Sequence, residues 1–159
     1  MERTLLGLRS MTQSNDLPSL FGRFTTILRD HEHLATTLRR LRLMCARLEG
    51  GQTAHATDQD PPTLFAELRA DLEEHFEAEE SPAYFGIVMS EDPALATQVA
   101  ELKWEHLAML HETAKLCELS LDPERLAELP APTRALIAQL EGHERSESEL
   151  LRKLFRRSR

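Results

Sequence analysis

A histidine followed four residues later by a glutamate occurs twice within apolar stripes of helical period, and this pairing constrains the fold more than any other feature. His75 and Glu79 form the first pair, and His143 and Glu147 form the second. Residues four apart share one face of a helix, so both pairs are expected on the sides that face the core. A carboxylate is costly to bury unless it is paired or bound to a metal ion. Both pairs therefore favour a metal site inside a helical protein.

Two further histidines lie in the apolar stripes of other expected helices. His31 belongs to a stripe within residues 20–48, and His106 belongs to a stripe within residues 95–117; the apolar residues of both recur at intervals of three and four. Four histidines are thus expected to point inward, one from each helix. The remaining histidines lie off these stripes or in a loop and are expected at the surface: His33, His55 and His111.

The spacing of start and stop signals predicts four helices. They are expected to begin after residue 15 with Asp16 as N-cap, at Pro61-Pro62 with Asp60 as N-cap, at the polar run 90–93, and after a proline-containing connection at 119–132. Gly50-Gly51 should end the first helix, and Pro82 should kink or break the second, leaving 83–89 helical or irregular. The fold class is therefore all-α, with a four-helix bundle as the expected architecture. Residues 1–159 fit a single domain, with the bundle at about 18–155 and a short lead-in at 1–15.

Charge and composition narrow the classes of partner and compartment. The net charge of −8 disfavours nucleic acid and anionic membranes as partners. The sequence has no signal-peptide core and no stretch long enough to span a membrane, so a cytoplasmic protein is expected. Cys45 and Cys117 are expected as buried free thiols, with a redox pair between the first and third helices as the alternative. Trp104 is expected in the core or at its boundary.

Four imidazoles and two carboxylates together describe a site for two metal ions. If each glutamate bridges both ions and each ion takes two histidines, every ion receives two nitrogen and two oxygen ligands. Mixed nitrogen and oxygen donors without a thiolate favour iron first, then manganese or zinc. The Glu-x-x-His motif of ferritin-like di-iron bundles does not occur in the sequence. A dinuclear site that is richer in histidine is therefore expected.

Two interpretations stay open for each of three residues close to the expected ligands. Glu80 and Glu105 directly neighbour Glu79 and His106 in the sequence, and each is expected either in solvent or in hydrogen-bonding contact with a ligand. Tyr84 is expected as a packed ring, the alternative being a hydroxyl that orients a molecule bound at an open metal position.

The order of these motifs resembles that of a known family. Asp30-His31, His75-Phe-Glu-Ala-Glu79-Glu80, Glu105-His106 and His143-Glu-Arg-Ser-Glu147 are similar to the H, HxxxE, H, HxxxE series of hemerythrin-like (HHE cation-binding) domains, over about residues 18–155. The resemblance implies an antiparallel up-down four-helix bundle that holds two iron ions in a non-haem centre. It also implies terminal ligands at His31, His75, His106 and His143, and bridging ligands at Glu79 and Glu147.

One departure from the family bears on function. Oxygen-carrying hemerythrins have an HxxxH pair on the third helix, whereas the second position here is Leu110. The expected function is therefore binding or sensing of O2, NO or peroxide rather than oxygen carriage. Enzyme-like consumption of peroxide or NO, or iron handling at the same site, is one alternative, and a metal-free helical interaction module is the other. The sequence indicates no particular protein partner.

Overall fold

The computed structural model describes the backbone of residues 17–51 and 60–157, together with their side chains except those of 17–31, 155 and 157. The lead-in 1–15, the N-cap Asp16 and His55 fall outside the described residues. His31 belongs to a described helix, but its side chain lies outside the described part.

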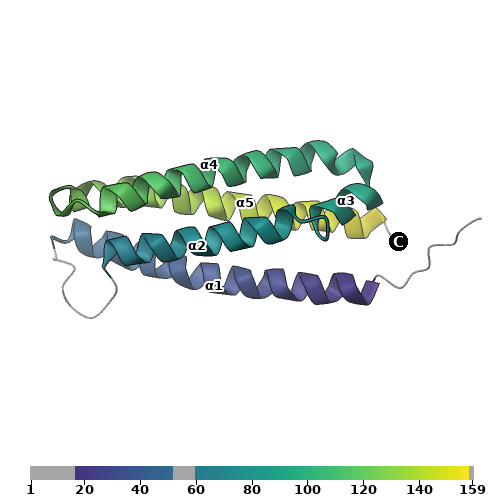
Figure 1. Cartoon of the computed structure of the whole chain (residues 1–159), viewed down its shortest axis with the longest axis horizontal. Helices are drawn as coiled ribbons and strands as arrows, with labels where there is room; N and C mark the ends of the chain where they lie inside the picture. Colours follow the sequence, from purple (N-terminus) through teal and green to yellow (C-terminus); the bar gives the residue numbers. More distant parts are fainter. Residues whose placement is uncertain (1–16, 52–59, 158–159) are drawn as a thin grey trace, which may run out of the picture.

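All regular structure in the described residues is helical, which confirms the all-α prediction. The elements are α1 (Leu17–Glu49), α2 (Pro61–Glu80), α3 (Phe85–Glu91), η1 (Pro93–Leu95), α4 (Ala96–Ser120), η2 (Pro123–Glu128) and α5 (Pro130–Arg157). The four long helices lie side by side in a bundle (Figure 1), in which α1 and α4 each contact both α2 and α5. Within the described ranges, no helix is both long and apolar enough to cross a membrane.

Glycine and proline set the ends of α1 and α2 where the sequence predicts them. Gly51 has a φ of 68°, and its N–H donates to the carbonyl of Leu48 at 3.2 Å, which closes the end of α1. Asp60 is the N-cap of α2, but its side chain makes no capping hydrogen bond. An N-cap side chain accepts from the second or third helical N–H, and the second position here is Pro62, which has none.

Two helix starts differ from the prediction by a few residues. The run 90–93 does not start the third long helix, because α3 continues to Glu91 and α4 begins only at Ala96. Asp92 instead caps the short turn η1 by accepting from the N–H of Ala94 at 3.1 Å. The last helix begins at Pro130, inside the stretch expected to be a connection. A proline in the first helical turn lacks only an N–H that has no helical partner, so it can start the helix.

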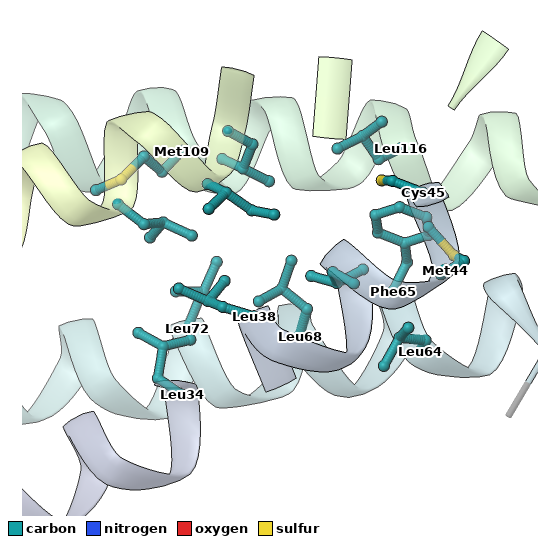
Figure 2. Packing of buried hydrophobic residues seen from close by; sticks show 14 of the residues in the cluster. Leu34, Leu38, Met44, Cys45, Leu64, Phe65, Leu68, Leu72, Met109 and Leu116 are labelled. Atoms are coloured by element: carbon teal, nitrogen blue, oxygen red, sulfur yellow. The ribbon is translucent and has the colours of Figure 1, made fainter. Parts of the chain in front are cut away.

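Two apolar clusters make up the core. The larger cluster joins α1, α2, α4 and α5, and Figure 2 shows Leu38, Phe65 and Leu68 facing Met109 and Leu116. The smaller cluster lies around α3 and the start of α4: Tyr84, Phe85, Val88, Leu95, Val99, Leu102, Leu150 and Leu154. Each fully buried Leu or Phe contributes about 1.5–3 kcal/mol to folding. Along α4 and α5 the two clusters are separated by the segments that carry the buried histidines.

The structure corrects one prediction about α4 and defines the buried face of this helix. Trp104 was expected in the core or at its boundary but is 73% exposed, because it lies two residues, about 200° around the helix, from the buried His106. Leu110 is only half-buried against the larger cluster, and Met109 occupies the buried position, at 2% exposure. The inward stripe of α4 therefore passes from His106 to Met109, three residues on.

The two cysteines are free and structural in character. Cys45 is buried and Cys117 is half-buried. Their sulfur atoms donate to backbone carbonyls, that of Cys45 to Pro130 at 3.9 Å and that of Cys117 to Phe65 at 3.4 Å. Burial raises the pKa of both thiols. Neutral thiols held by backbone carbonyls favour the structural interpretation over a redox pair.

Candidate metal centre

Five of the six residues expected at the site lie together in the centre of the bundle. His75 and Glu79 come from α2, His106 comes from α4, and His143 and Glu147 come from α5. All five side chains are buried. The sixth residue, His31, lies on α1 with its side chain outside the described part. Three helices thus bring charged or titratable groups to one buried region.

The placement of these groups follows from helix periodicity. Within α2 the pair continues the buried face of Leu68 and Leu72, and within α5 the histidine follows Leu140 three residues later. In both helices the i, i+4 spacing brings the glutamate onto the same face as the histidine, one turn further on. The pairs therefore form a polar layer between the two apolar clusters.

Three buried groups converge on one point of this layer. His106 Nε2 lies 3.1 Å from His143 Nε2 and 3.2 Å from Glu79 Oε2. His143 Nε2 is 3.8 Å from the same carboxylate oxygen. We call these three residues the distal group, because His106 and His143 lie on helices other than that of Glu79.

A second set of potential ligands shares Glu79. His75 Nε2 lies 2.7 Å from Glu79 Oε1. The ligating atoms of His75, Glu79 and Glu147 all lie within 4.8 Å of one another, and we call these residues the proximal group. The two oxygens of Glu79 therefore face different groups, Oε2 the distal group and Oε1 the proximal group. A carboxylate placed in this way can bridge two metal ions.

Two carboxylates outside the layer hold the histidines of the distal group. His106 Nδ1 lies 2.8 Å from Glu80 Oε1, and His143 Nδ1 lies 2.8 Å from Glu105 Oε2. An ionised carboxylate only accepts hydrogen bonds, so each Nδ1 carries the proton and donates it. Each Nε2 then presents a lone pair to the layer, which is the tautomer that a metal ligand needs. Each glutamate thus contacts a histidine that the sequence predicts as a ligand, while its own side chain stays partly exposed to solvent.

Aromatic rings fix the plane of His106. Its imidazole lies against the ring of Phe76, with centroids 4.0 Å apart and planes 8° from parallel, and Phe85 lies on it at 6.0 Å and 14°. Phe76 also meets the ring of His143 edge-on at 5.7 Å. These apolar rings limit both the rotation of the imidazoles and the access of water to their ring faces.

Tyr84 reaches the layer because the helix breaks before it. Pro82 forces the preceding residue out of the helical region, and Ser81 has φ −60° and ψ 152°. The buried Tyr84 hydroxyl then donates to Glu147 Oε1 at 3.2 Å. Burial raises the pKa of this phenol, and the charges of Glu147 and Glu79 raise it further. Tyr84 is therefore a neutral hydrogen-bond donor to a carboxylate of the proximal group.

The electrostatics of the layer favour a bound cation. Burial lowers the pKa of His143, but hydrogen bonds to Glu79 and Glu105 and the charge of Glu147 outweigh this effect, so the pKa is raised above its ordinary value. The layer thus draws a positive charge to the place where His106 Nε2, His143 Nε2 and Glu79 Oε2 meet. Either a proton or a metal ion can supply that charge. Nitrogen and carboxylate oxygen donors suit divalent transition metals, so the buried groups could hold such an ion.

Some of these contacts could not be read from the sequence. The Phe76 and Phe85 rings on His106 depend on how α2, α3 and α4 meet, and Phe85 follows a break whose direction the sequence does not specify. The only sequence signal for the outer carboxylates is their position directly beside Glu79 and His106.

Comparisons with known proteins add no relative. No family model matches the sequence, and no curated protein or solved structure matches it significantly. Any function assigned to the chain therefore rests on the residues of the polar layer and on the order of their motifs along the helices.

Proposed function

We propose that this chain is a hemerythrin-like protein that binds two iron ions in the polar layer and uses them to bind or sense O2, NO or peroxide. The observation that carries the proposal is Glu79, whose two oxygens face two different sets of buried donors. Two sets of nitrogen and oxygen donors that share one carboxylate suit a pair of metal ions.

The arrangement of the helices supports the antiparallel up-down bundle that this family has. In Figure 1, α1 and α4 finish at the end of the molecule where α2 and α5 begin. Each long helix contacts two others and does not contact the fourth to a comparable extent. Such a ring of helices places inward side chains from several of them in one central layer.

The donor set supports iron over zinc or manganese. The described donors are three imidazoles and two carboxylates, and His31 is the proposed sixth ligand from α1. A pair of iron ions held by these residues would supply redox chemistry and would bind small oxygen or nitrogen oxides. Leu110, one turn after His106, packs against the larger apolar cluster and offers no further donor.

The residues around the layer support binding of a small ligand. Phe76 and Phe85 stack on the ring of His106, so the surroundings of this donor are largely apolar. The Tyr84 hydroxyl is a neutral donor at the edge of the same layer. Apolar rings with one neutral hydrogen-bond donor suit a small ligand such as a diatomic molecule or peroxide.

Metal analysis tests the proposal first. Metal-free protein reconstituted anaerobically with Fe²⁺ and freed of excess ion should retain about two iron ions per chain, since the donors form two groups. Retention of less than half an ion per chain would contradict the dinuclear centre and would favour a metal-free interaction module.

Reaction with ligands tests the second part. The reduced iron-loaded protein should change its absorption spectrum on titration with NO, with an endpoint proportional to the number of iron ions. Catalytic consumption of peroxide or NO in excess of the iron present would instead support the enzyme-like alternative. No spectral response to O2, NO or peroxide would remove the proposed ligand class.

A further inference from the structure

We infer that the two halves of the centre are unequal and fill in a fixed order: the first metal ion binds the distal group, Glu79, His106 and His143, and the second completes the proximal group, His75, Glu79 and Glu147. This inference rests on the proposed function. It concerns residues outside the ligand set, Glu80, Glu105 and Tyr84, which act as positioning residues.

The distal group is strengthened by its outer carboxylates. Glu80 accepts from His106 Nδ1, and Glu105 accepts from His143 Nδ1, each at 2.8 Å. A carboxylate on the far nitrogen makes the ligating nitrogen more basic and holds the ring in the ligating tautomer. The side chains of Glu80 and Glu105 are 38% and 47% exposed, so water offsets most of the cost of keeping them ionised. Both imidazoles of the distal group thus have this support.

The three donors of the distal group are also arranged before an ion binds. The stacking of Phe76 on His106 and the contact of Phe76 with His143 restrict the planes of both rings. With both Nδ1 atoms donating outward, the two Nε2 lone pairs face Glu79 Oε2. Little rearrangement is then needed when an ion binds, which favours tight binding.

The proximal group contains a carboxylate that is weakened as a ligand. The Tyr84 hydroxyl donates to Glu147 Oε1 at 3.2 Å and draws electron density from it. A phenol is neutral near pH 7, so the hydroxyl keeps its proton and remains a donor. A metal ion at the proximal group must compete with this hydrogen bond or use the other oxygen.

The shared Glu79 makes the second binding step weaker still. Once an ion occupies the distal group, one oxygen of Glu79 is engaged and its charge is partly neutralised. The second ion also meets the positive charge of the first at short range. The two steps should therefore be separated, with a ratio of dissociation constants of about tenfold or more.

The order can be observed with Zn²⁺, which is diamagnetic and also binds histidine nitrogen and carboxylate oxygen. Metal-free protein labelled with ¹⁵N at histidine is titrated with Zn²⁺, and the imidazole nitrogen resonances are followed while calorimetry records the two dissociation constants. The first equivalent should move the Nε2 resonances of His106 and His143, and the second should move those of His75. A shift of the His75 resonance first, or a shift of all three histidine resonances together with equal affinities for the two ions, would overturn the inference.

Substitutions separate the two steps. Glu105→Gln should raise the first dissociation constant about tenfold and leave the second unchanged within experimental error. Tyr84→Phe should lower the second dissociation constant and leave the first unchanged. Glu101→Gln is the matched control, since Glu101 lies one turn before Glu105 on α4 and is exposed. Equal effects of Glu105→Gln and Glu101→Gln, or of Glu105→Gln on both steps, would also contradict the inference.

The outcomes for the two proposals are distinguishable. A failure of the wild-type protein to bind any Zn²⁺ or Fe²⁺ would overturn both the proposed centre and the order of filling. Binding of two ions in the wrong order, or of two ions with equal affinities, would leave the dinuclear centre standing and overturn only the inference. The wild-type titration alone decides the order, so the result does not depend on the folding of a variant.

Discussion

At the scale of single residues, Glu79 is the group on which the proposed centre depends most. Its side chain is fully buried, and its two oxygens lie 2.7 Å from His75 Nε2 and 3.2 Å from His106 Nε2. Both groups of donors lose their common anion if this carboxylate is neutralised. A single neutral substitution should therefore affect both metal positions.

Glu79→Gln is expected to reduce iron content below one ion per chain, because glutamine keeps the shape of the side chain but is a poor bridging ligand. Elemental analysis after reconstitution with Fe²⁺ measures the effect. Glu77→Gln serves as the control, since Glu77 is exposed two residues away on α2. Equal iron contents in the two variants would show that Glu79 is not a ligand.

The raised pKa of His143 predicts a pH dependence for the metal-free protein. A histidine whose folded pKa exceeds its unfolded value of about 6.5 stabilises the fold below that value, and the contribution is lost as pH rises through the folded pKa. Metal-free protein should therefore lose stability in urea titrations as the pH rises above about 6.5, and His143→Gln should reduce this loss. A slope unchanged by the substitution would contradict the assigned cause.

The inward positions of single residues could be predicted from the sequence where helix periodicity alone determines them. His75, Glu79, His143 and Glu147 could be placed inward from their spacing alone. Trp104 could have been placed at the surface by the same rule, but its size and apolar character suggested the core. The partners of Glu80 and Glu105 lie on neighbouring helices, so helix spacing alone could not identify them.

At the scale of elements, each long helix has one face in the core and one face toward solvent. The same substitution should therefore change the free energy of unfolding by different amounts on the two faces. Leu72 on α2 is fully buried in the larger cluster, whereas Leu107 on α4 is 58% exposed. Both are leucines inside long helices, so alanine changes helix propensity at the two positions by the same small amount.

Leu72→Ala is expected to lower the free energy of unfolding by about 2–5 kcal/mol, because it removes buried methyl groups and leaves a cavity. Leu107→Ala should change it by no more than about 0.5 kcal/mol. Urea denaturation measured on both variants provides the comparison. Similar losses at the two positions would mean that the faces of α2 or α4 have been assigned wrongly.

The helix boundaries show what local sequence signals can and cannot specify. Gly51 and Pro82 mark breaks that were predicted, since a left-handed turn and a proline each act within a few residues. The start of α5 at Pro130 was missed because a proline can either interrupt a helix or begin one. The break at Pro82 was predicted, but the return of Tyr84 toward Glu147 depends on the packing of α3.

At the scale of the whole molecule, the polar layer lies between two apolar clusters, and α4 and α5 contribute to both of them. Burial of His106, His143 and Glu79 in this position opposes folding unless their charges are compensated. A bound metal ion would supply that compensation and would join α2, α4 and α5 at one point. Metal binding should therefore couple to the stability of the entire bundle.

Addition of Fe²⁺ to the metal-free protein is expected to raise the melting temperature. An ion at 100 times its dissociation constant adds about 2.7 kcal/mol to the native state, which corresponds to roughly 5–10 °C for a domain of this size. Anaerobic thermal denaturation with and without a chelator measures the shift. The melting temperature of Glu79→Gln should not respond to iron, and an equal response of this variant would contradict the coupling.

The most direct test of the dinuclear centre is the distance between the two metal ions. X-ray absorption spectroscopy of the iron-loaded protein should show an iron–iron scattering path of about 3.5–4 Å, because the two groups share the carboxylate of Glu79. Iron that is bound in full amount but shows only nitrogen and oxygen neighbours, with no iron–iron path, would contradict a bridged pair in the polar layer.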